Sequence, residues 1–127
     1  RKTQELVEAS QNAFKIALEE GVLIATGTDC GGPGHLHGTL PEEIALMVRL
    51  GATPTQALQF ATREAAVLLE LDSQVGTLEV GKYADIAVFN GDLLNNIDSI
   101  LNVNTVIRDG EIVINKKTSN VESLIFS

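Results

Sequence analysis

The sequence predicts an α/β fold from three patterns: an apolar repeat at helical spacing, a continuous apolar run directly after it, and a β-rich final third. The repeat predicts an amphipathic helix over residues 3–20, closed by Gly21. The run at residues 22–25 is typical of a strand buried on both faces, and a helix that leads into such a strand favours a parallel sheet. The apolar residues of the repeat are Leu6, Ala9, Ala13, Phe14 and Ala17.

Two further helices are expected in the middle of the chain. Thr39-Leu40-Pro41-Glu42 has the capping-box form and predicts a helix over residues 40–50, closed by Gly51. Thr53-Pro54-Thr55-Gln56 repeats the start signal with proline at the first helical position, and this helix should reach about residue 70. The residues expected to be buried are Ile44, Met47 and Val48 in the first helix, and Ala57, Leu58, Ala61, Ala65, Leu68 and Leu69 in the second.

The pattern changes from helical to extended after Leu71. Strands are expected within residues 84–89, 105–107 and 112–114, and Asp109-Gly110 is a strong hairpin-turn signal between the last two. This β-rich third is a candidate for a second domain. The pattern of residues 116–127 predicts no definite structure.

The composition indicates a globular protein and argues against several partners. The chain has 127 residues, 44% of them apolar, and a net charge of -8. This charge would repel a nucleic-acid backbone or an anionic membrane surface, and no apolar run approaches the roughly 18 residues of a membrane-spanning helix. A single cysteine, Cys30, cannot form an internal disulfide, which fits a reducing, cytoplasmic location. Because the chain opens at Arg1 without a methionine, it is expected to be a fragment.

Asp29 is the first candidate for chemistry. It follows the predicted strand in Gly27-Thr28-Asp29, and parallel α/β folds place ligands and catalytic side chains at that end of their strands. From position alone, a working carboxylate and an aspartate that only caps a turn are equally good interpretations.

Three segments, in order, resemble the amidohydrolase superfamily. Residues 21–29, which end in Gly27-Thr28-Asp29, look like the eighth barrel strand of that family. Residues 53–66 resemble the helices that follow, and residues 76–88 resemble the return to a small β-sandwich. The glycine-rich loop 31–38 ends in His37-Gly38 before a helix that contains Glu42. This loop is similar to the branch with imidazolonepropionase-like proteins, Xaa-Pro dipeptidases and N-acyl amino acid carboxypeptidases.

The resemblance implies a fold and an activity. Residues 1–71 would hold the last strand and helices of a (β/α)8 TIM-like barrel, residues 72–115 part of a β-sandwich, and residues 116–127 a tail. The activity would be metal-dependent hydrolysis of an amide or related C–N bond in a small, amino-acid-derived substrate, with one or two divalent ions and zinc as the expected metal. Asp29 would be both metal ligand and general base, because a carboxylate that touches metal and water can take the proton of that water. His37 would contact the substrate.

The rest of the family's site is absent from this sequence. Its His-x-His pair, bridging lysine or glutamate and two later histidines would lie upstream of Arg1, so the isolated chain is expected to be inactive. His35-Leu36-His37 has the His-x-His pattern, but it follows Asp29 in the sequence instead of preceding it. Metal ligation by this pair is therefore less favoured than a loop or substrate-contact role. Cys30 is expected to be a small buried side chain with no base nearby to activate it. Lys82 and Asp85 are expected to be structural.

Two noncatalytic interpretations stay open. A strand at residues 22–25 without neighbours would expose both edges, which favours a self-associating module and a homo-oligomer. The other is a small metal-binding protein that uses Asp29, His35 and His37.

Overall fold

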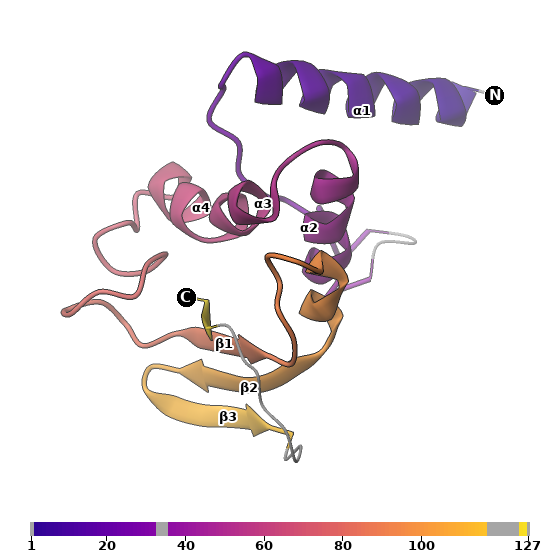
Figure 1. Ribbon diagram of the computed structural model, residues 1–127. Helices are drawn as coiled ribbons and strands as arrows, with labels where there is room; N and C mark the ends of the chain where they lie inside the picture. The colour runs from indigo at the N-terminus through magenta and orange to yellow at the C-terminus, as the bar shows by residue number, and fades with distance from the viewer. Residues whose placement is uncertain (1, 33–35, 117–124, 127) are drawn as a thin grey trace.

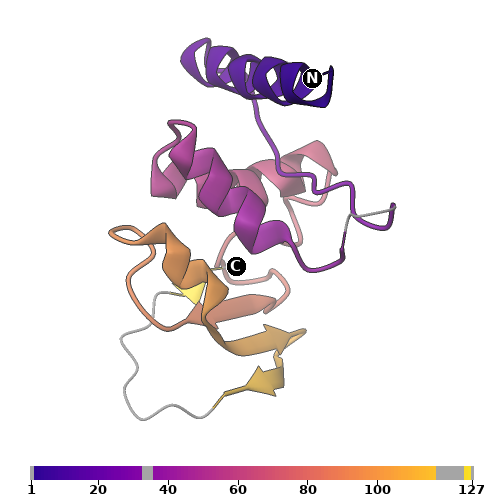
Figure 2. The ribbon, with the colours of Figure 1, turned by 90° about the vertical axis from the view of Figure 1, so that its right-hand side faces the viewer.

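The computed structural model describes residues 2–32, 36–116 and 125–126. Figure 1 shows three layers, with α1 outermost, α2, α3 and α4 in the middle, and a β-sheet below, and Figure 2 shows the same order from the side. This arrangement confirms the α/β class. No helix of the described part is both long and apolar enough to cross a membrane. The elements are α1 (Lys2–Glu19), α2 (Leu40–Arg49), α3 (Pro54–Ala61), α4 (Arg63–Leu68), β1 (Ile86–Phe89), the 3-10 helix η1 (Ile97–Leu101), β2 (Val103–Arg108), β3 (Glu111–Asn115) and β4 (Ile125–Phe126).

The sheet has four strands in the order β3-β2-β1-β4, and every neighbouring pair is antiparallel. Asp109 and Gly110 join β2 to β3 with φ angles of 50° and 80°, which are the two positive values that a type I′ hairpin turn requires. The hairpin prediction is therefore confirmed. The expectation of a parallel sheet is wrong for the described residues. All of their strands lie within residues 86–126, and they pair only in antiparallel fashion.

Residues 22–25 do not form the expected strand. They belong to no helix or ladder, and Val22 and Leu23 are each 57% exposed rather than buried. A strand exists only through hydrogen bonds to neighbouring strands, and the described chain brings no strand beside this segment. The backbone N–H of Thr26 instead donates to the carbonyl of Phe60 at 3.1 Å, which fixes the segment beside α3.

The first two helices lie where the sequence predicted them. Gly21 closes α1, with the N–H of Val22 bonded to the carbonyl of Ala17 at 3.0 Å. In α2, Ile44 and Met47 are buried as expected. The capping box expected at its start does not form, because the Thr39 hydroxyl donates to the Leu36 carbonyl at 3.2 Å and caps no helical N–H.

The third predicted helix begins as expected but ends early. Its capping box forms, with the Gln56 N–H donating to Thr53 Oγ1 at 3.2 Å and the Thr53 N–H donating to Gln56 Oε1 at 2.9 Å. Thr62 then leaves helical geometry, and its hydroxyl donates to the Leu58 carbonyl at 2.8 Å. The chain restarts as α4, so the apolar stripe does not continue. Leu68 and Leu69, expected to be buried, are each 65% exposed.

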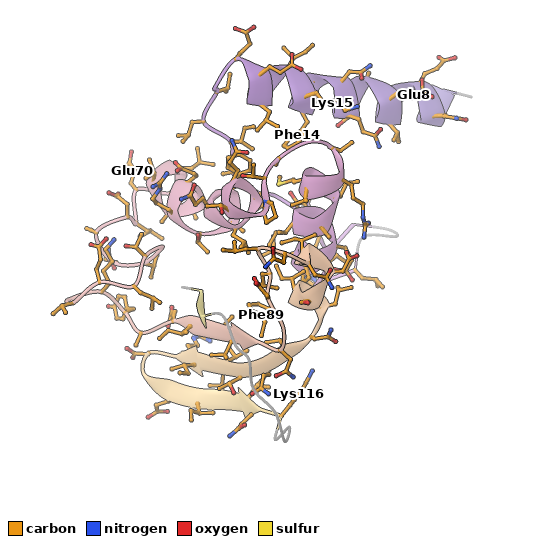
Figure 3. All side chains as sticks on the ribbon, in the orientation of Figure 1. Glu8, Phe14, Lys15, Glu70, Phe89 and Lys116 are labelled. Atoms are coloured by element: carbon orange, nitrogen blue, oxygen red, sulfur yellow. The ribbon has the colours of Figure 1, made fainter. Side chains whose placement is uncertain are left out.

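One hydrophobic core joins the helix layer to the β-rich part. Its buried members include Ile44 and Leu58 from the helices and Phe89 from β1. In Figure 3 the side chain of Phe89 lies between the sheet and the helices, and Phe14 lies on the side of α1 that faces the helix layer. Phe14 and Leu18 pack against the edge of this core, which ties the C-terminal half of α1 to the rest of the molecule.

Candidate active-site segment

Asp29 lies at a sharp turn after the segment that leaves α1. Its φ of 47° is in the left-handed region, which few residues other than glycine adopt and which aspartate tolerates better than most. The side chain is exposed. The turn therefore presents the Asp29 carboxylate to solvent at the place where the sequence predicted a working carboxylate.

Glu43, in the first turn of α2, holds the backbone just before Asp29. Its Oε1 atom accepts a hydrogen bond from the Gly27 N–H at 2.8 Å. Its Oε2 atom is buried and has no hydrogen-bond partner among the described residues. Sequence reasoning missed Glu43, although its spacing of four residues from Met47 places it on the buried side of the helix. Glu42, its exposed neighbour, is on a different face.

Cys30 and His37 meet at the base of the glycine-rich loop. The Cys30 Sγ atom lies 3.3 Å from His37 Nδ1, and both residues are exposed. The expectation of a buried cysteine with no base nearby is therefore wrong. The turn at Asp29 carries residue 30 outward, and the returning loop brings the imidazole of His37 to it. His35 lies outside the described residues.

The described residues do not assemble a metal site by themselves. No group of three or more His, Cys, Asp or Glu side chains within the described ranges could hold an ion. Asp29 can fill one ligand position, and a complete set requires donors from elsewhere.

Lys82 and Asp85 make structural contacts, as expected. The Lys82 ammonium donates to Thr77 Oγ1 at 2.6 Å. Asp85 Oδ1 accepts from the Asp109 N–H at 2.7 Å and so supports the β2–β3 turn. Neither group faces the other as an acid–base pair.

An apolar cavity of about 360 Å³ lies between the helix layer and the sheet. Ile44, Leu58 and Phe89 are among its lining residues, and the segment 27–30 is not. The cavity and Asp29 are therefore separate features. Cys30 and His37 also lie outside the cavity lining.

Comparison with known proteins decides the family. Residues 1–113 match the model described as the amidohydrolase family. The chain belongs to the amidohydrolase family. The resemblance drawn from the three sequence segments is thereby confirmed.

The relatives include the branch that the loop suggested. The imidazolonepropionase of Brevibacillus brevis is 35% identical over 113 residues, which cover 86% of this chain and 26% of that protein. A crystal structure of a Xaa-Pro dipeptidase with methionine bound in its active site is 38% identical, with a TM-score of 0.76, over 82% of this chain and 25% of that one. An amidohydrolase from Thermotoga maritima MSB8 is 28% identical, with a TM-score of 0.69, over 83% and 26%. The chain thus spans about a quarter of these relatives.

Proposed function

We propose that this chain is part of a metal-dependent amidohydrolase that hydrolyses an amide or related C–N bond in a small, amino-acid-derived substrate. The observation that carries the proposal is the exposed Asp29 turn within a family match over residues 1–113. In this proposal residues 1–71 belong to the end of a (β/α)8 barrel, residues 72–115 to a β-sandwich and residues 116–127 to a tail.

Asp29 is the proposed general base. Its carboxylate accepts the proton of the attacking water and returns it to the nitrogen that leaves, which is the work of a positioned carboxylate in hydrolysis. Asp29 would also be one ligand of a divalent ion, with zinc as the expected metal. When bound, that ion supplies the acidity that makes water a nucleophile at neutral pH. The other ligands come from outside the described residues.

His37 is the proposed substrate contact. Its Nδ1 atom faces Cys30 Sγ at 3.3 Å, which leaves Nε2 as the ring nitrogen for a polar group of the substrate. A contact of this kind binds substrate and transition state alike, so its loss raises KM more than it lowers kcat.

The test of this proposal is Asp29→Asn in the complete enzyme. Asparagine keeps the shape and one ligand oxygen but removes the basic site, so kcat should fall about a hundredfold or more while KM changes much less. His37→Ala in the same assay should instead raise KM more than it lowers kcat. Near-normal turnover by Asp29→Asn with its metal retained would remove Asp29 from the role of base.

A second candidate, a self-associating module, is favoured by the uncovered apolar side chains of residues 4–25. Leu6 is 70% exposed, Ile16 59% and Leu23 57%. Large apolar side chains left exposed in one part of the chain favour association with a partner that covers them, and we propose a homo-oligomer as the state of the 127-residue chain. Light scattering at micromolar concentration should give the mass of a dimer or larger species, and a clean monomer would contradict the proposal.

The third interpretation, a small metal-binding protein that uses Asp29, His35 and His37, draws no support from the described residues, which gather no group of ligands.

A further inference from the structure

We propose that Glu43 is the positioning residue for Asp29, an inference that rests on the proposed role of Asp29. The bond from the Gly27 N–H to Glu43 Oε1, at 2.8 Å, joins positions 16 residues apart in the sequence. It ties the segment two residues before Asp29 to the first turn of α2. Its length of 2.8 Å is that of a well-formed N–H···O hydrogen bond, so this contact is a firm anchor.

The segment needs such an anchor because it has no ladder of its own. Residues 22–29 lie outside every helix and strand. Thr26 is held by its bond to the Phe60 carbonyl and Gly27 by Glu43, so α3 and α2 fix two consecutive residues. Asp29 then adopts a left-handed backbone conformation, which persists only where the surroundings hold it. The anchor therefore determines where the Asp29 carboxylate lies.

Stability alone does not explain a glutamate at position 43. Its Oε2 atom is buried without a hydrogen-bond partner in the described part of the chain, and a buried polar atom left unpaired lowers the stability of the fold. An apolar side chain beside the buried Ile44 and Met47 would avoid that cost. The start of α2 offsets part of it, because a carboxylate is favoured in the first turn of a helix. The carboxylate is best explained by its bond to Gly27.

The kinetic test compares Glu43→Ala, Glu43→Gln and Glu42→Ala in the complete enzyme. Glu43→Ala frees the segment and should lower kcat about tenfold to a hundredfold with little change in KM, because small misplacement of a catalytic group has that effect. Glu43→Gln keeps an amide oxygen for the Gly27 N–H and should recover most of kcat. Glu42→Ala removes an exposed carboxylate from the same helical turn and should leave kcat unchanged. The proposal is overturned if Glu43→Ala matches Glu42→Ala or if Glu43→Gln recovers nothing.

A second measurement does not depend on activity. Hydrogen exchange of the Gly27 amide, followed by NMR in the 127-residue chain, should be slow in the parent chain, in Glu42→Ala and in Asp29→Asn. In Glu43→Ala it should be at least about tenfold faster, since the bond that protects it is gone. Unchanged exchange in Glu43→Ala would refute the anchor. Normal turnover by Asp29→Asn would instead refute the role of Asp29, so the two failures are distinguishable.

Discussion

Residues 4–25 and the region from α2 to η1 have similar apolar patterns but very different burial. In the first region Leu6 is 70% exposed and Leu23 57%. In the second, Ala57 and Leu93 are fully buried and Ile100 is 4% exposed. Both regions carry the sequence signal of a buried face, but the buried core lies in the second, and from the first only partly buried residues such as Phe14 and Leu18 pack against it. A pattern thus indicates which face will be covered without indicating what covers it.

The candidate site lies where these two regions meet. Asp29 follows the exposed residues 4–25, and Glu43, in the packed region from α2 to η1, anchors the backbone before Asp29 through Gly27. The packed region therefore fixes the position of the carboxylate, while the uncovered side is where further ligands and substrate would approach. Measurements of activity and stability can test this difference between the two regions.

The 127-residue chain alone is expected to have no hydrolase activity. One exposed carboxylate cannot hold and activate a metal ion unaided, and no ligand group forms within the described residues. The purified chain should therefore hydrolyse dipeptides and N-acyl amino acids no faster than a heat-treated control, with or without added zinc. Metal-dependent turnover above that control would mean that the uncovered side already holds a complete site.

Leucine truncations should separate the two regions by stability. Leu58 is 5% exposed and Leu23 is 57% exposed. Leu58→Ala leaves a cavity in the core and should lower the free energy of unfolding by about 2 to 5 kcal/mol. Leu23→Ala should lower it by less than about 0.5 kcal/mol, as exposed substitutions do. Urea unfolding measures both values, and similar losses would show that residues 22–25 are covered in solution.

Local signals in the sequence predicted much of the packed region. The capping pair Thr53 and Gln56 and the turn Asp109-Gly110 each act within a few residues, and both form as expected. Predictions were wrong where the outcome depends on distant partners. Residues 22–25 find no strand beside them within the described part of the chain. The missing cap at Thr39 is a local exception, because its hydroxyl bonds the carbonyl of Leu36, three residues back, instead of a helical N–H.

The candidate site was predictable in its position but not in its contacts. The motif Gly27-Thr28-Asp29 and its resemblance to a family are enough to single out Asp29 from the amino-acid sequence alone. Glu43 and the Cys30–His37 pair were missed, because each depends on a loop that returns to the segment. Helical spacing could have marked Glu43 as facing inward, but only the fold shows that Gly27 is its partner.

The smallest expected effect concerns the loop after α4, where Gly76 lies against that helix. A Cβ atom added at Gly76 would lie 2.6 Å from the Cβ atom of Ala66, which is backed by helix and buried. Gly81 has almost the same φ angle, 97° against 94°, but open space around it. Gly81→Ala therefore measures the backbone strain alone, and Gly76→Ala adds the collision. Gly76→Ala should lower the free energy of unfolding by about 1 to 3 kcal/mol more than Gly81→Ala, as overpacking typically does. Equal losses in urea unfolding would show that α4 shifts away from the added methyl group at little cost, so that this contact is loosely packed.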